Sequence, residues 1–295
     1  MKIRANNIAI EIEDTGGAGP AVLLIMGLGM QLIAWPPAMV QALVDTGYRV
    51  VRMDNRDIGL SQHFDHYGSP NLLWAALKHK LGIFIKPPYT LHDMAQDAIG
   101  VLDALKIDRA HIVGASMGGM IAQRVALATP QRVLSLTSIM STSGARDLPA
   151  PKGEVMRAMM SRPAGKDEAS VVAHYAKLFS VIGSPAFPTA PQVLRERVLQ
   201  GMQRNFHPEG TSRQMLAIAA DTTRAAELAQ VNSPTLVLHG KADPLVPFAC
   251  GEDTARRIPG AQLHGIDGMG HDLPPEVVDR LLACMLPFFA TLKIA

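Results

Sequence analysis

Cysteine, aromatic residues and net charge are all scarce in this sequence. Cys250 and Cys284 are its only cysteines, and they form neither a CxxC pair nor a metal-ligand spacing with histidine, so we expect no disulfide framework and a reducing compartment. Aromatic residues make up 5% of the chain, and the net charge of +2 comes without a basic tract interleaved with aromatics. This pattern argues against a nucleic-acid partner and provides no electrostatic attraction to an anionic membrane.

Long uninterrupted apolar runs are also lacking, although hydrophobic residues form 48% of the chain and charged residues 18%. The longest run, Ala21–Met30, is too short to cross a bilayer and is typical of a buried strand. Near the N-terminus, Asn6, Asn7 and Glu11 stand where a signal peptide needs apolar residues. We therefore expect a globular, cytoplasmic protein with no membrane partner, and the sequence leaves homo-oligomerisation open.

Short apolar runs alternate with segments of helical spacing. The runs lack polar alternation, as is typical of strands covered on both faces; they are Ala21–Met26, Tyr48–Met53, Ala110–Val113 and Thr235–His239, with a last strand expected over Gln262–Ile266. Helical spacing marks Pro37–Asp45, His92–Leu105 and Met120–Ala128. The alternating stretch Lys2–Asp14 favours an antiparallel edge hairpin. This order predicts an α/β fold with a mostly parallel central sheet and helices on both faces.

Residues 144–230 break the alternation, because they contain no convincing strand and are rich in Pro, Gly, Met and Arg. Short helices are expected there over Val155–Met160, Ser170–Phe179, Val193–Met202 and Arg213–Ala220. We interpret residues 144–230 as a helical cap inserted between two strands of a core made of residues 1–143 and 231–295. Residues 63–89 are expected to form a further, irregular insertion in that core.

A G-x-S-x-G motif, from Gly114 to Gly118, is the sharpest chemical signal. It follows an expected strand and runs into an apolar helix, so Ser116 would stand at a sharp strand-to-helix turn with its hydroxyl exposed above the sheet. The helix start adds a positive dipole and free N–H groups. An ordinary tight turn could use the same five residues, but the strand before and the helix after favour Ser116 as a nucleophile.

A serine hydroxyl needs a base to accept its proton, and the sequence contains ten histidines. His111 and His239 lie within expected strands, where packing explains them, and most of the others lie in surface-like or inserted segments. His271 follows the expected last strand on a glycine-rich loop, from which it could reach over the sheet to Ser116. We predict that His271 is the general base.

The acid that orients the histidine should lie between Ser116 and His271 in the chain. Asp243 stands in a loop after the Thr235–His239 run, at a carboxyl end of the kind where open parallel sheets place their sites. Its rivals are Asp267 and Asp272, which lie near His271 in sequence only, and Asp272 is better explained as a helix cap. The prediction is Asp243.

Acyl transfer also needs donors for an oxyanion, and backbone N–H groups usually provide them. Met117, the residue after the candidate nucleophile, is one expected donor. Leu28, in the Gly27-Leu28-Gly29 loop after an early strand, is the other, although that loop could also be an ordinary turn.

Together these residues resemble the α/β-hydrolase fold, and the resemblance covers nearly the whole chain. In that family the nucleophile follows the fifth strand and a cap is inserted after the sixth. The segment from Asp54 to Ser61 resembles the family's D-x-R-G-x-G-x-S turn, with Asp57 in place of the usual glycine, and we take it as architectural. Met26-Gly27 replaces the common His-Gly of the oxyanion loop, which keeps the backbone donor. With Trp35-Pro36 it is similar to methylesterases that act on anthracycline polyketides and to related bacterial esterases.

The resemblance implies a serine hydrolase that cleaves small-molecule carboxylic esters of small or medium apolar acyl groups through an acyl-enzyme on Ser116. Haloalkane dehalogenases and epoxide hydrolases resemble the chain too, but they attack with aspartate, and Ser116 argues against both. Carbon–carbon bond hydrolysis, thioester hydrolysis and lactone hydrolysis stay open, as does a ligand-binding relative that has lost catalysis. The sequence carries no metal-ligand cluster, phosphate-binding loop or dinucleotide fingerprint, so we expect no metal and no cofactor.

Adaptable apolar side chains in residues 144–230 could line an acyl pocket, or could simply attach cap helices to the core. They are Met156, Met159, Met160, Phe179, Met202, Phe206 and Met215.

Overall fold

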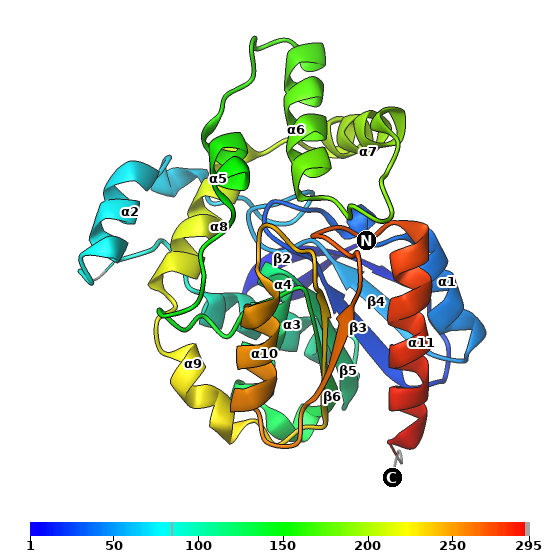
Figure 1. Cartoon of the computed structure of the whole chain (residues 1–295). Helices are drawn as coiled ribbons and strands as arrows, with labels where there is room; N and C mark the ends of the chain where they lie inside the picture. The colour runs from blue at the N-terminus through cyan, green and yellow to red at the C-terminus, as the bar shows by residue number, and fades with distance from the viewer. Residues whose placement is uncertain (84, 293–295) are drawn as a thin grey trace.

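A twisted sheet forms the centre of the protein (Figure 1). The computed structural model describes residues 1–83 and 85–292, so Phe84 and residues 293–295 of the expected core lie outside it. Within the described residues the sheet has eight strands, in the order β1-β2-β4-β3-β5-β6-β7-β8. They are β1 (Lys2–Ala5), β2 (Ile8–Asp14), β3 (Ala21–Ile25), β4 (Arg49–Met53), β5 (Ala110–Ala115), β6 (Val133–Ile139), β7 (Thr235–Gly240) and β8 (Gln262–Ile266).

Strand directions match the expected topology. β1 pairs with β2, and β2 with β4, in antiparallel register, which confirms the edge hairpin. The pairs from β4 through β3, β5, β6 and β7 to β8 are parallel, which confirms the mostly parallel sheet. The carboxyl ends of these six strands therefore meet at one edge, where a site can form.

β6 was not among the strands that the apolar runs predicted. Its sequence VLSLTSI intersperses hydroxyl residues with apolar ones, yet all seven residues are buried. Hydrogen bonding offsets part of the cost of burying these hydroxyl groups, since Ser135 Oγ lies 2.8 Å from Nδ1 of His111 on β5. A buried strand that carries hydroxyl side chains lacks the continuous apolar run by which strands are recognised.

Helices cover both faces of the sheet. α1 (Pro37–Asp45) and α11 (Pro275–Thr291) pack on one face, in a core cluster that includes the fully buried Trp35. α3 (Leu91–Ala104) and α4 (Met117–Ala128) pack on the other. The remaining helices outside the insertion are α10 (Phe248–Arg257) and the short 3-10 turns η1 (Leu32–Ala34), η2 (Asp65–Tyr67) and η3 (Pro130–Arg132). A fourth 3-10 turn, η4 (Leu228–Gln230), ends the insertion. The three helices predicted from spacing are confirmed, except that α4 begins at Met117, directly after Ser116.

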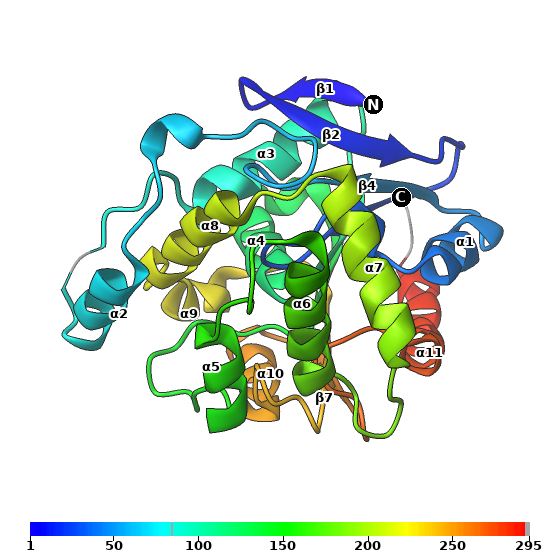
Figure 2. The ribbon, with the colours of Figure 1, turned by 90° about the horizontal axis from the view of Figure 1, so that it is seen from above.

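Residues between β6 and β7 form the inserted helices, which confirms an insertion after the sixth strand. They are α5 (Gly153–Met160), α6 (Glu168–Ile182), α7 (Pro191–Arg204), α8 (Pro208–Ala220) and the short α9 (Arg224–Glu227). Figures 1 and 2 show α5, α6 and α7 standing on one side of the sheet, with α8 lying against the core. Residues 63–89 are less irregular than expected, because α2 (Leu72–Lys80) lies within them and projects from the body.

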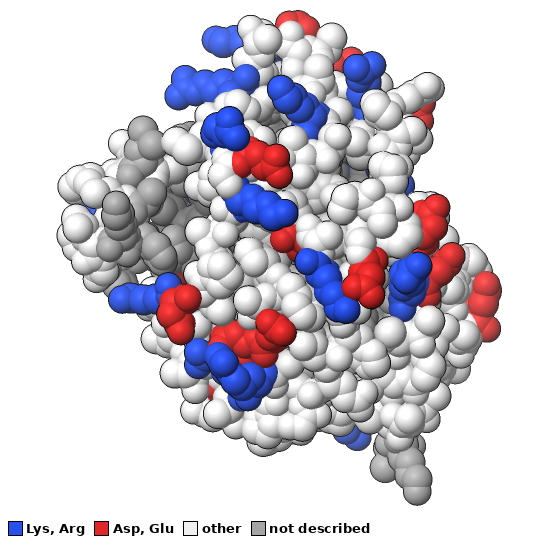
Figure 3. Space-filling view, viewed as in Figure 1, with Lys and Arg blue, Asp and Glu red and all other residues white. Residues whose placement is uncertain are grey.

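Charged side chains of both signs lie side by side over much of the face shown in Figure 3, as the small net charge leads one to expect. Among the described helices, none combines the length and the apolarity that crossing a bilayer requires.

Candidate active site

Ser116 lies at the turn between β5 and α4. Its φ of 56° is in the left-handed region, which costs a non-glycine residue energy and persists only where surrounding structure enforces it. A Cβ on Gly114 would lie 2.0 Å from the Gly118 carbonyl oxygen, and one on Gly118 would lie 2.0 Å from that of Ile25. The two glycines of the motif are therefore required by close backbone approach, and the turn between them presents the Ser116 side chain.

The backbone of Ser116 is fixed by the neighbouring strand. Its N–H donates to the Ile139 carbonyl at the end of β6 (2.9 Å), and its own carbonyl accepts from Ser141 Oγ (2.7 Å). The hydroxyl position is thereby set by core residues of β5, β6 and the segment after them.

The structure brings Ser116, His271 and Asp243 together. His271 Nε2 lies 2.9 Å from Ser116 Oγ, and His271 Nδ1 lies 2.7 Å from Asp243 Oδ2. Because an ionised carboxylate can only accept, Nδ1 must carry the proton, which leaves Nε2 of a neutral imidazole free to accept the hydroxyl proton. The arrangement can thus deprotonate a serine hydroxyl.

Both partner residues of the serine are held by backbone groups. The second carboxylate oxygen of Asp243 accepts from the N–H groups of Leu245 (2.9 Å) and Val246 (2.8 Å), and the Asp243 side chain is fully buried. The His271 N–H donates to the carbonyl of Ile182, the last residue of α6 (2.7 Å). Asp243 is therefore fixed by its own turn, whereas the backbone of His271 is fixed by an inserted helix.

Asp272 is not a helix cap, so that expectation is wrong. The residue before α11 is Pro274, and no side chain caps the helix. Instead Asp272 Oδ1 accepts from the N–H (2.9 Å) and the Oγ (2.5 Å) of Ser184, just beyond α6. Ser184 Oγ in turn accepts from the Gly270 N–H (2.9 Å). Burial raises the pKa of Asp272, although these hydrogen bonds oppose the rise.

The loop after β3 lies directly beside Ser116. A Cβ on Gly27 would stand 3.1 Å from Ser116 Cβ and 3.6 Å from its Oγ. The loop turns back through a hydrogen bond from the Met30 N–H to the Gly27 carbonyl (3.2 Å). Within the part of the chain that the structure describes, the N–H groups of Leu28 and Met117 have no protein acceptor. Both amides therefore remain available to a ligand.

The turn after β4 carries Asp57 where glycine is usual in the resembling family. Its φ of 70° explains that usual glycine. The buried Asp57 carboxylate accepts two hydrogen bonds from Arg213 of α8 (2.7 and 2.8 Å) and one from the Tyr89 hydroxyl (2.8 Å). Burial alone would raise the pKa of Asp57, but the bonds from Arg213, the Phe64 N–H and Tyr89 hold it below its usual value. The turn thus joins core to insertion, in line with an architectural role.

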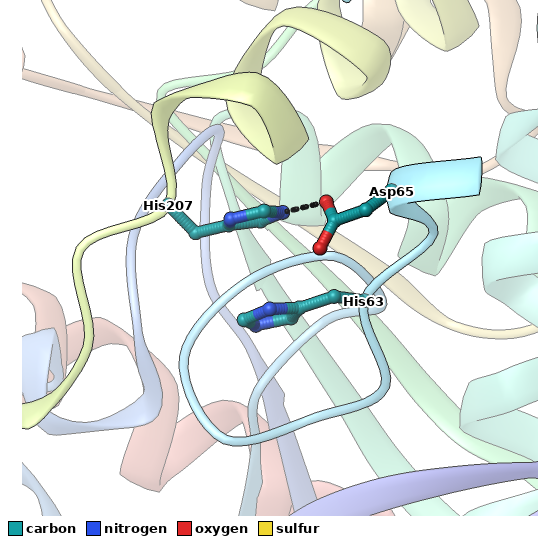
Figure 4. A group of neighbouring side chains, drawn as sticks. All are labelled: His63, Asp65 and His207. Atoms are coloured by element: carbon teal, nitrogen blue, oxygen red, sulfur yellow. Dashed lines mark ion pairs between the residues drawn. The ribbon is translucent and has the colours of Figure 1, made fainter. Parts of the chain in front are cut away.

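A group of possible metal ligands, His63, Asp65 and His207, lies near this turn (Figure 4). The two imidazole rings stack with centroids 3.9 Å apart. Arg213 Nη2 lies 3.0 Å from both Asp65 Oδ1 and His207 Nε2. Because a guanidinium already occupies the space beside these ligand atoms, a metal ion would meet a fixed positive charge there. We interpret the group as part of the contact between core and insertion.

The apolar side chains that were expected to line an acyl pocket differ in how exposed they are. Four of them are exposed: Met156, Met159, Met160 and Phe206. Part of the surface of each therefore neither lines a pocket nor attaches a cap helix to the core. The half-buried members of the set are Phe179, Met202 and Met215.

Residues that sequence reasoning missed come from the insertion and reach the site over long distances in sequence. Gln214 of α8 accepts from the Gly29 N–H (3.0 Å), and Ser184 binds the histidine loop. A glutamine or serine in an amphipathic segment carries no local signal of such a partner.

Comparison with known proteins agrees with this geometry. A family model described as the alpha/beta hydrolase fold matches residues 20–276. The chain is 30% identical to a rhodomycin D methylesterase from Streptomyces sp. (strain C5), over 96% of this chain and 95% of the relative. It is 28% identical to a 2-hydroxy-6-oxononadienedioate/2-hydroxy-6-oxononatrienedioate hydrolase from Cupriavidus pinatubonensis, over 89% and 84%.

Among solved structures, a meta-cleavage product hydrolase from Pseudomonas fluorescens IP01 superposes with a TM-score of 0.76 at 22% identity, over 99% of this chain and 98% of that one. At that identity the likeness concerns the fold alone. The family match and the methylesterase relative go further, and this chain belongs to the alpha/beta hydrolase fold family, as a hydrolase with esterase-like relatives.

Proposed function

We propose that this hydrolase cleaves carboxylic esters through an acyl-enzyme on Ser116. The continuous hydrogen-bonded line from Ser116 through His271 to Asp243 carries the proposal. In the first step Ser116 Oγ bonds to the ester carbonyl carbon and its proton passes to His271 Nε2. The carbonyl oxygen becomes an oxyanion facing the free N–H groups of Leu28 and Met117, and Asp243 stabilises the imidazolium.

The intermediate then breaks its bond to the alcohol oxygen, which takes the proton from His271 and leaves as the alcohol. The acyl group remains esterified to Ser116. Water attacks this ester while its proton passes to the same nitrogen, and the second intermediate breaks the bond to Ser116 Oγ. That oxygen regains the proton, the carboxylic acid leaves, and substrate and water supply every atom of the products.

Paired arginines favour a substrate that is uncharged around the scissile bond. Every buried arginine in the described chain pairs with a carboxylate: Arg56 with Asp97, Arg213 with Asp57, and Arg124 and Arg224 with Asp221. A substrate carboxylate that recruited one of these buried arginines would have to displace its partner, which costs about 3–5 kcal/mol for a buried pair. One relative is named for a dioate and another for a methyl ester. The pairing favours the methyl-ester type of substrate.

A fluorophosphonate probe and a series of p-nitrophenyl esters with increasing acyl length test the proposal. The wild-type protein should be labelled and should release p-nitrophenol from small or medium acyl chains. Ser116→Ala should abolish labelling and lower kcat by about 10⁴-fold or more, because the attacking oxygen is gone. Ser143→Ala alters a buried serine whose Oγ binds Asp253 rather than His271, so it is the matched control and should keep wild-type labelling and kcat.

Two outcomes would contradict the proposal. A folded wild-type protein that stays unlabelled and hydrolyses no ester would favour a ligand-binding relative. Faster turnover of a 2-hydroxy-6-oxo-dienoate than of any ester would favour carbon–carbon bond hydrolysis instead. Thioesters and lactones of matched acyl group, measured beside the esters, complete the comparison.

A further inference from the structure

Gln214 is a fully buried polar residue that links an inserted helix to two core loops. Its Oε1 accepts from the Gly29 N–H (3.0 Å) in the loop after β3, and its Nε2 donates to the Arg56 carbonyl (2.9 Å) in the turn after β4. Both ends of the side-chain amide are therefore used. The position therefore requires a side chain that accepts a hydrogen bond at one end and donates one at the other. An amide does so in a single orientation.

The insertion also contacts the same loop on either side of that bond. Thr211, one turn earlier on α8, packs so closely that a Cβ on Gly29 would lie 2.8 Å from its Oγ1. Gln31 donates to the carbonyls of Gly201 (2.7 Å) and Asn205 (2.6 Å), at the end of α7. The segment from Gly29 to Gln31 is thus held by the insertion rather than by the sheet.

The peptide planes of the loop after β3 show what the hydrogen bond between Gln214 and Gly29 controls. The Gly27 carbonyl accepts from the Met30 N–H, and in a trans peptide the Leu28 N–H, which shares that plane, points the opposite way. The next peptide plane holds the Gly29 N–H, which Gln214 fixes. With both planes held, the direction of the Leu28 N–H is determined, and the residue before it, Gly27, lies beside Ser116.

We propose that Gln214 is a positioning residue for the reaction: by holding the Gly29 N–H it aims the Leu28 N–H at the oxyanion. The inference rests on the proposed function, since it assigns the support of one of the two donors. It also gives α8 a part in catalysis, because a donor displaced by about 1 Å loses much of its effect on the transition state.

The first test is Gln214→Met, which preserves volume and removes both hydrogen bonds. The kcat for the best p-nitrophenyl ester should fall by about 10- to 100-fold, with KM within about twofold of wild type. The inhibition constant of a trifluoromethyl ketone, whose adduct with a serine carries an oxyanion, should rise by the same factor as kcat falls.

Gln123→Met is the matched control. Gln123 is equally buried and also joins core to insertion, since its Oε1 accepts from Arg224 Nε (2.8 Å), but it does not touch the loop after β3. Its kcat and inhibition constant should stay within about twofold of wild type.

Gln214→Glu adds a test that does not depend on Gln214→Met folding. A protonated glutamic acid can donate to the Arg56 carbonyl and accept from the Gly29 N–H, as the amide does, whereas the carboxylate would repel the carbonyl 2.9 Å away. The ratio of the variant's kcat to that of wild type should therefore fall about tenfold or more from pH 5.5 to pH 9. Taking the ratio removes any pH dependence of catalysis that both enzymes share.

Unchanged kcat in Gln214→Met, equal losses in Gln123→Met, or a ratio for Gln214→Glu that is flat with pH would each overturn the inference. These results are distinct from failure of the proposed function, which would appear as a wild-type protein that neither reacts with the fluorophosphonate nor hydrolyses esters.

Discussion

The turn that carries Ser116 and the loops that meet it are held by different parts of the molecule. Core backbone fixes the turn, through Ile139 of β6 and the close approach of Ile25 to Gly118. The histidine loop and the loop after β3 are held in part by the insertion, through Ile182, Ser184 and Gln214. Core structure therefore places the hydroxyl, and the inserted helices place much of what acts on it.

We therefore expect substitutions in the core site and in the insertion to affect kcat and stability differently. A change at the core site should remove chemistry outright, because each side chain there has its own part in the proposed reaction. A change in the insertion should displace loops by fractions of an ångström, so that it lowers kcat or stability by a smaller amount. Four substitutions, taken from the largest expected effect to the smallest, test that comparison.

Asp243→Asn should have the largest effect on turnover, lowering kcat by about 10³- to 10⁴-fold, because an amide facing Nδ1 favours the wrong imidazole tautomer. Folding should be preserved, since Asn retains an oxygen for the N–H groups of Leu245 and Val246. Asp267→Asn is the control: Asp267 is the rival in sequence, yet it is exposed and, among the residues that the structure describes, forms an ion pair with Lys241 alone. Equal losses in both variants, measured with the same ester, would remove Asp243 from the site.

Arg213→Met should have the largest effect on stability. It leaves the fully buried Asp57 without its cation, which costs about 3–5 kcal/mol in the free energy of unfolding. Adding Asp57→Asn should recover much of that loss, because Asn tolerates the positive φ and needs no cation. Denaturant unfolding of the single and double variants measures this. A single variant within about 1 kcal/mol of wild type would show that the insertion is held elsewhere.

The division between core and insertion also separates the features that the sequence predicts from those that it does not. Strands with continuous apolar runs, and the turn at Ser116, are determined by neighbouring residues, so local pattern located them. β6 was missed because its buried hydroxyl side chains interrupt the apolar run, and the partners of Ser135 and Ser138 lie on other elements. Gln214 and Gly29 are 185 residues apart, and Ser184 and Gly270 are 86 apart. No local pattern carries such pairings, which is why Asp272 was wrongly assigned to a helix cap.

Acid should weaken the core before it weakens the contact between core and insertion. Burial lowers the pKa of His111 on β5 to about 4, against about 6.5 in an unfolded chain. The unfolded state therefore binds a proton first, and about 3 kcal/mol of stability, fully present above pH 6.5, is lost as the pH falls towards 4. The depressed pKa of Asp57 implies that its pair with Arg213 loses strength only below about pH 4.

His111→Gln isolates this contribution. The difference in free energy of unfolding between wild type and the variant should shrink by about 3 kcal/mol between pH 7 and pH 4, because the variant has no group to titrate there. Urea unfolding at several pH values provides the measurement. Parallel stability curves for the two proteins would contradict the assignment to His111.

Ser184→Ala should have the smallest effect, and it bears most directly on the comparison. The substitution leaves the Gly270 N–H without its acceptor and removes the hydroxyl that binds Asp272, so we expect a loss of about 1–3 kcal/mol of stability and about tenfold in kcat, with KM little changed.

Ser143→Ala controls for the loss of a buried serine. Ser143 makes the same pair of contacts, donating to Asp253 (2.5 Å) and accepting from the Ala145 N–H (3.2 Å), but it lies away from the histidine loop. It should lose similar stability and keep its kcat. If Ser184→Ala also keeps its kcat, the inserted helices secure the histidine loop without setting its catalytic geometry. The placement of His271 would then have to be assigned to the core rather than to the insertion.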